Sequence, residues 1–168
     1  MSGKYAAKTD VPVSRSRDEI ERTLTRFGAS AFAYMTNTDG QVAISFEISN
    51  VRVLMRMQLP ARSAFRYDSR GKVRTDSAIE RDWEQACRQR WRSLANGVKA
   101  KLALIDDGIS TVEREFLADI VVPSTGQTYG EIAIPQLRDV YTKHQLPPVV
   151  PGSDANPRVI ELPERNAV

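Results

Sequence analysis

Residues 41–58 read QVAISFEISNVRVLMRMQ, and this stretch decides the fold. Apolar side chains alternate with small or polar ones on both sides of Ser49-Asn50. The alternating apolar positions are Val42, Ile44, Phe46 and Ile48 before that pair, and Val51, Val53, Met55 and Met57 after it. A period of two turns one apolar face towards a core and leaves Arg52 and Arg56 on the opposite face. The stretch therefore predicts two antiparallel strands joined by a tight turn.

A third strand and a helix are predicted upstream. Phe32 and Tyr34 alternate with small residues, and residues 37–40 (NTDG) have the composition of a turn. Further towards the N-terminus, Ile20 and Leu24 recur on one helical face, and Gly28 is placed to end that helix. The sequence thus predicts a helix over residues 16–28 followed by a three-stranded β-meander.

Downstream of the sheet, apolar residues recur every three or four positions over about 30 residues, the spacing of one long amphipathic helix. The series is Ile79, Trp83, Cys87, Trp91, Leu94, Val98, Leu102 and Ile105. Both tryptophans are expected to be core anchors, because they lie on this apolar stripe. Gly108 is expected to close the helix.

Ser/Thr–x–x–Glu pairs, the spacing of reciprocal capping boxes, indicate where helices begin. They occur at Ser16/Glu19, Ser77/Glu80, Ser110/Glu113 and Thr128/Glu131. Pro135 is expected to start a further helical turn. The predicted fold is α+β, a three-stranded antiparallel β-meander packed against one long amphipathic helix with short flanking helices. Residues 1–15 are expected to form a flexible lead, residues 16–146 a single domain, and residues 147–168 a mobile proline-rich tail.

The composition argues against most enzyme classes. One cysteine (Cys87) and one histidine (His144) cannot supply a Cys/His zinc site of four ligands, and they make a Ser–His–Asp triad improbable. Neither a phosphate-binding P-loop nor a GxGxxG motif occurs. The Glu-x-Lys element typical of metal-dependent nucleases is missing as well. We therefore expect a protein that is not an enzyme and that needs no cofactor and no metal.

The charge distribution is the strongest functional indication. Residues 52–101 contain 13 of the 24 Lys/Arg residues but only five of the 21 acidic ones, whereas the net charge of the whole chain is +3. A cationic surface attracts polyanions, of which nucleic acid is the commonest. On a helical wheel, four basic side chains lie within about 40° of one another, opposite the apolar stripe. They are Arg81, Arg88, Arg92 and Lys99.

The segment that precedes the long helix adds more cations, with aromatic rings between them. Arginine forks hold phosphates, and aromatic rings stack on unpaired bases. The candidate nucleic-acid-binding residues are Arg62, Phe65, Arg66, Tyr67, Arg70, Lys72, Arg74, Arg81, Arg88, Arg92 and Lys99. A competing interpretation is that these charges only form a solvated or protein-facing surface, since arginine is also a good helix former.

Three strings of the sequence together resemble a family of small proteins encoded by tailed phages and prophages. They are YAAKTDVPVSRSRDEIERTLTRFGA at residues 5–29, WRSLANGVKAKLALIDDGISTVEREFLADIVVPSTGQTYGE at residues 91–131 and LPPVVPG at residues 146–152. No catalytic residues are defined for that family, so none is carried over to this chain. The resemblance implies either a nucleic-acid-binding role or an inhibitor of a host protein.

Two functional hypotheses result. The first is a non-catalytic protein that binds single-stranded or irregular DNA or RNA through the basic residues. The second is a module that docks on a host bacterial protein. No apolar run reaches the ~20 residues of a membrane helix, and the N-terminus lacks a signal peptide, so we expect no membrane partner and a location in the host bacterial cytoplasm.

A homodimer is also expected from the outer face of the sheet. Leu54 lies there between two arginines and beside Ala43 and Ser45. This face is therefore more apolar than expected of a fully solvent-exposed sheet face. Two such faces, or two sheet edges, would pair across a two-fold axis. Alternatively, the N-terminal helix or residues 112–141 cover this face within one chain.

Overall fold

The computed structural model describes residues 10–143, and its contacts divide the chain into two compact units between Ala133 and Ile134. The predicted boundary at residues 146 and 147 and the proline-rich tail lie outside the described residues. Of the predicted lead 1–15, residues 10–15 are described, and residues 13–15 already belong to the first helix. The following paragraphs describe the first unit.

The sheet is the predicted three-stranded antiparallel meander. Strands β1 (Ser30–Thr36), β2 (Gln41–Ile48) and β3 (Val51–Gln58) lie in the order β1-β2-β3. Between β2 and β3, Ser49 and Asn50 have φ values of 49° and 63°, as a two-residue hairpin of the primed type requires. The register of the whole hairpin therefore follows from this turn, and it places Phe46 opposite Val53.

One face of the sheet carries the core. All four alternate apolar residues of β2 are buried, and Phe46 and Val53 are fully inaccessible to solvent. The predicted alternation is thus confirmed for the central strand. The side chains of β3 are less completely covered, because its Met55 and Met57 lie only at the margin of the core.

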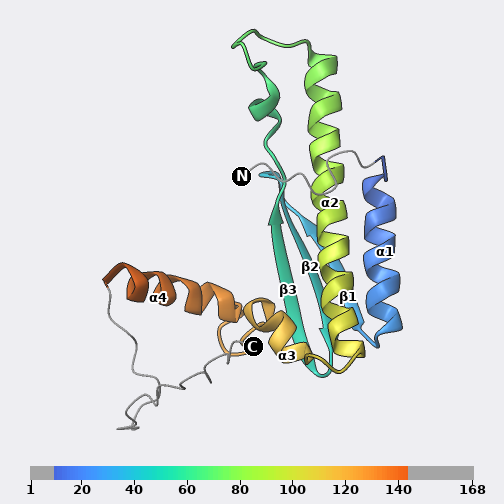
Figure 1. Cartoon of the computed structure of the whole chain (residues 1–168), viewed down its shortest axis with the longest axis vertical. Coiled ribbons are helices and arrows are strands. Elements are labelled where there is room, and N and C mark those ends of the chain that lie inside the picture. The colour runs from blue at the N-terminus through green and yellow to red at the C-terminus, as the bar shows by residue number, and fades with distance from the viewer. Residues whose placement is uncertain (1–9, 144–168) are drawn as a thin grey trace, which may run out of the picture. The chain divides into compact units, whose positions relative to one another are not determined.

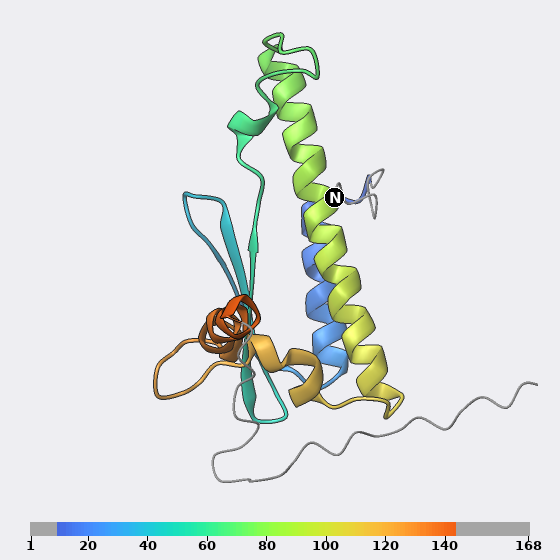
Figure 2. The same ribbon diagram turned by 60° about the vertical axis from the view of Figure 1, so that its left-hand side comes forward.

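Helices α1 (Val13–Arg26) and α2 (Asp76–Asp106) lie side by side along this face (Figures 1 and 2). The predicted single long helix is confirmed, with 31 residues. From α1, Ile20 and Leu24 enter the core, and from α2, Trp91 does so with its ring centroid 5.9 Å from that of Tyr34. The sheet is therefore covered by a pair of helices rather than by α2 alone.

The N-terminal part of α2 extends beyond the end of the sheet, together with the segment that leads into it (Figures 1 and 2). Trp83 lies in this part and is only partly buried, unlike the core residue Trp91. Its indole N–H donates a hydrogen bond of 2.9 Å to the carbonyl oxygen of Pro60. Trp83 thus anchors the incoming segment to the helix, a different role from the predicted one in the core.

Three of the predicted capping boxes are wrong. Helix α1 begins at Val13, after Pro12, and the backbone N–H of Ser16 already bonds to the Pro12 carbonyl inside the helix. The N-caps of the next two α-helices are Thr75 and Thr111. Their hydroxyl oxygens accept hydrogen bonds from the backbone N–H groups of Ala78 and Arg114, respectively, each three residues further along the chain. Thr75 lies two positions before the predicted Ser77, and Thr111 lies one position after the predicted Ser110. Neither threonine has Glu or Gln three residues later, so the spacing rule selected the wrong neighbour.

The fourth capping box is confirmed. The backbone N–H of Thr128 donates to the Glu131 carboxylate at 2.8 Å, and the backbone N–H of Glu131 donates to the Thr128 hydroxyl at 3.2 Å. Helix α4 (Tyr129–Lys143) follows this box. Pro135 lies inside α4 instead of starting a new turn. Residues from Ile134 onwards belong to the second unit.

The segment after α2 closes one edge of the sheet. Helix α3 (Val112–Phe116) and the 3₁₀ turn η2 (Leu117–Asp119) lead to Ile120, which pairs with Val53 of β3. Phe116 is fully buried, with its ring edge-on to Phe46 at a centroid distance of 5.7 Å. Glu131 reaches the outer face of the sheet, where it forms an ion pair with Arg56. Part of the segment predicted as an alternative cover thus does contact the sheet.

Among residues 10–143, no helix combines the length and the apolar character needed to cross a membrane.

Two glycines give opposite predictions for the stability of this fold. Gly97 lies inside α2 with open space where a Cβ would be, so Gly97→Ala should stabilise the protein by about 0.5–1 kcal/mol through helix propensity. At Gly130 a Cβ would meet the Ala118 carbonyl oxygen at 2.6 Å, so Gly130→Ala should destabilise by about 1–3 kcal/mol. Urea unfolding of both variants measures the two free energies, and equal signs would contradict this packing.

Candidate nucleic-acid interface

Residues 66–74 form a small hairpin, called the arm from here on, within the segment that joins β3 to α2. Its turn is held by Asp68, whose carboxylate accepts hydrogen bonds from the backbone N–H groups of Arg70 at 2.8 Å and Lys72 at 2.9 Å. Gly71 adopts the positive φ of 78° that this turn requires. The arm is therefore ordered by hydrogen bonds, because it lies beyond the end of the sheet and contributes no residue to the core (Figures 1 and 2).

One face of the arm presents apolar surface to solvent. Tyr67 and Val73 form an antiparallel bridge, and directly opposed residues of such a pair project on the same face. Their exposed fractions are 55% and 59%. An exposed aromatic ring beside an exposed β-branched residue is unusual on a solvent-exposed hairpin. Such a pair is suited to contact with a planar ligand.

Three cations surround this pair. The guanidinium of Arg66 lies 5.8 Å from the centre of the Tyr67 ring, which restrains both side chains. Arg70 and Lys72 are exposed at the turn, and neither forms an ion pair with any residue of the described part of the chain. The structure thus brings four of the predicted binding residues together in the arm, namely Tyr67 and the three cations. None of these cations forms an ion pair with a described residue.

The base of the arm is neutralised instead. Asp82 of α2 binds both Arg74 and Arg81, the latter at 3.1 Å, and Glu80 binds Arg62 at 2.7 Å. The hydrogen bonds from Arg74 and then Arg81 hold the pKa of the Asp82 carboxyl below its usual value. Phe65 is partly buried in the 3₁₀ turn η1 (Arg62–Phe65), next to this cluster. These contacts fix the arm on α2.

The predicted stripe along α2 does not form one uniform surface. Arg88 is held by Gln85 at 2.8 Å and Glu84 at 3.4 Å, and Arg92 forms an ion pair with Glu19 of α1. The side chains of both arginines are only about a quarter exposed, at 26% and 27%. The partners of Arg88 lie on α2 itself, whereas a helical wheel of α2 cannot reveal the ion pair of Arg92, because Glu19 comes from a distant part of the sequence.

Lys99, at the far end of the stripe, lines a groove between α1 and α2. This groove also contains Arg22 and Arg26 of α1, which the sequence analysis did not single out. A signal for them existed. Arg15, Arg22 and Arg26 repeat the spacing of seven and four that drew attention to Arg81, Arg88 and Arg92.

Among residues 10–143, no group of three or more His, Cys, Asp or Glu side chains is arranged so that it could hold a metal ion. The single cysteine, Cys87, is buried on α2, and burial raises the pKa of its thiol. A buried thiol of raised pKa is inert rather than nucleophilic.

Comparison with known protein families, curated proteins and solved structures found no match to this chain.

The Asp82 cluster predicts a specific titration. Because its folded pKa lies below the usual value of 3.8, the Asp82 carboxylate stabilises the folded protein above that value, and this contribution is lost as the pH falls through the folded pKa. Arg74→Gln should raise the pKa of Asp82 towards 3.8, as measured by NMR titration of the side-chain carboxyl carbon. Arg70→Gln, which lacks the contact, should leave it unchanged. A shift of equal size in both variants would contradict the assignment.

Proposed function

We propose that this protein is a non-catalytic nucleic-acid-binding protein of the host bacterial cytoplasm, and that the arm contacts single-stranded or irregular DNA or RNA. The observation that carries the proposal is the exposed Tyr67 ring beside Arg66, Arg70 and Lys72. Stacking of a base on an aromatic ring contributes about 1–3 kcal/mol and does not depend on which base it is. Nearby cations bind phosphates and release counterions.

A single strand fits this surface better than a duplex does. The bases of a duplex are stacked on each other, so an exposed ring reaches them only where the strand is unpaired. The arm is also narrow, with few uncompensated cations, and this limits the contact to a short stretch of backbone. Arg81, whose side chain is 73% exposed, and Lys99 would extend the contact along α2.

The test is binding of labelled single-stranded DNA, double-stranded DNA and single-stranded RNA, followed by fluorescence anisotropy across a salt series. The triple variant Arg66→Ala/Arg70→Ala/Lys72→Ala should lower the slope of log K against log salt by about 2, because each lost phosphate contact removes about 0.7 on a single strand. Tyr67→Ala should weaken binding by about tenfold or more without changing the slope, because the ring carries no charge.

A matched control removes the same charge elsewhere. The triple variant Arg15→Ala/Arg114→Ala/Arg138→Ala also deletes three exposed cations but none from the arm or α2. It should retain most of the affinity and most of the salt slope. If the two triple variants lose affinity equally, only net charge matters and the arm is not the binding site.

A second candidate function is docking on a host bacterial protein. Helix α4 favours it, because Ile134, Leu137 and Tyr141 are 44%, 56% and 73% exposed and follow the i, i+3, i+7 spacing of one helical face. If this hypothesis is right, a partner is retained from nuclease-treated host lysate and is lost with Leu137→Glu.

A homodimer remains a proposal of the same kind, and light scattering would give about twice the chain mass of 18.8 kDa.

A further inference from the structure

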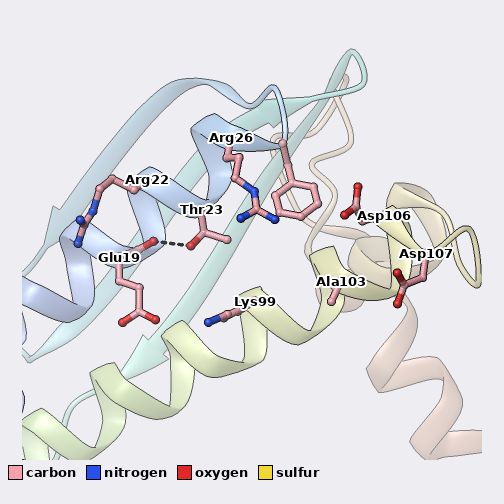
Figure 3. Close-up of a pocket in the computed structure, with 9 residues that line it drawn as sticks. Glu19, Arg22, Thr23, Arg26, Lys99, Ala103, Asp106 and Asp107 are labelled. Atoms are coloured by element: carbon pink, nitrogen blue, oxygen red, sulfur yellow. Dashed lines mark hydrogen bonds between the residues drawn. The ribbon is translucent and has the colours of Figure 1, made fainter.

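The groove between α1 and α2 has the composition of a small-ligand site. Its volume is about 410 Å³, within the range of small-molecule pockets. The two helices contribute cations, carboxylates and the apolar side chains Phe27 and Ala103. Figure 3 shows Arg26 from α1 and Lys99 from α2 directed towards the space between the helices, with Asp106 and Asp107 at the end of α2.

The cations of this groove lack counterions. Arg22, Arg26 and Lys99 form no ion pair with any of residues 10–143. Glu19, an acidic residue of the groove lining, forms an ion pair with Arg92 instead. Arg26 is also preorganised, because its guanidinium lies 5.2 Å from the centre of the Phe27 ring. Cations that line one groove and hold no ion pair are available to bind the anionic group of a ligand.

The carboxylates of the groove are placed where the fold disfavours them. Asp106 is the last residue of α2, and Asp107 is its C-cap. Acidic side chains at a helix C-terminus oppose the helix dipole, and α2 has no basic residue in its last turn. Neither carboxylate forms an ion pair in the described part of the chain. Residues that reduce stability without an evident structural gain are commonly retained for function.

We propose that this groove binds one nucleoside monophosphate. Its phosphate would be held by Arg26 and Lys99, and hydrogen-bond donors of its ribose or base would be held by Asp106 and Asp107, with Phe27 against the apolar part of the ligand. Such a ligand has an anionic end, an uncharged donor end and an apolar face between them. The groove offers the complement of each in one cavity of matching size. The proposal does not depend on the arm and would stand if the arm bound nothing.

The experiment is isothermal titration of the whole protein with AMP, adenosine and inorganic phosphate. AMP should bind with a dissociation constant in the submillimolar to millimolar range. Adenosine and inorganic phosphate should each bind at least about tenfold more weakly than AMP, because each contacts only one end of the groove. Arg26→Ala and Lys99→Ala should each weaken AMP binding by about tenfold. Arg114→Ala is the matched control, because Arg114 is equally exposed and lies outside both the groove and the arm, and it should bind AMP as the unmodified protein does.

Asp106→Asn provides a readout that a purely structural role would not produce. It should weaken AMP binding and at the same time raise the melting temperature, because it removes a charge that opposes the helix dipole. Two results would overturn the proposal. One is inorganic phosphate binding as tightly as AMP, which would reduce the groove to a simple anion site. The other is AMP affinity that is unchanged in both Arg26→Ala and Lys99→Ala.

Discussion

Burial of one face of a three-stranded sheet is the constraint on which the rest of this structure depends. Three strands cannot close on themselves, so the apolar face of β2 must be covered by other elements of the chain. Here α1 and α2 lie together on that face, while Phe116 closes the core against Phe46 from the end of α3. The pairing of Ile120 with Val53 then protects one edge of the sheet. The helix pair and the segment around Phe116 and Ile120 are thus positioned by contact with the sheet.

The same helix pair determines where charge is free and where it is compensated. Because α1 packs along α2, the ion pair between Glu19 and Arg92 removes the middle of the basic stripe from the surface. Beyond the end of the sheet, η1 and the arm contact α2, and the cations at the tip of the arm form no ion pair with any of the described residues. At the other end, the helices enclose the groove lined by Arg26 and Lys99. One packing arrangement therefore separates two cationic regions, the arm and a groove to which α1 and α2 both contribute.

The sequence predicted the elements well because their signals are local. Period-two alternation in residues 41–58 and the eight-membered apolar series of α2 each specify an element from its own residues, and both are confirmed. Helix starts were less accurate, because Thr75 and Thr111 compete with adjacent serines as N-caps. The candidate site was predictable only in part. The turn chemistry of Asp68 and Gly71 is local, whereas the neutralisation of Arg92 and Arg74 depends on which acids the fold brings near.

Local compensation also explains why net charge is a poor guide to a binding surface in this protein. Residues 52–101 hold a large excess of basic side chains. Acidic residues in the N-terminal half of α2 nevertheless form ion pairs with four of them, Arg62, Arg74, Arg81 and Arg88. Exposed ion pairs contribute little to stability, about 0–1 kcal/mol each, so a strongly charged ligand can displace them at small cost. A polyanion that first contacts the uncompensated arm would therefore gain further cations along α2 by exchange. In the proposed function, the acidic partners of these arginines would limit weak, non-specific binding more than they would limit a ligand already held at the arm.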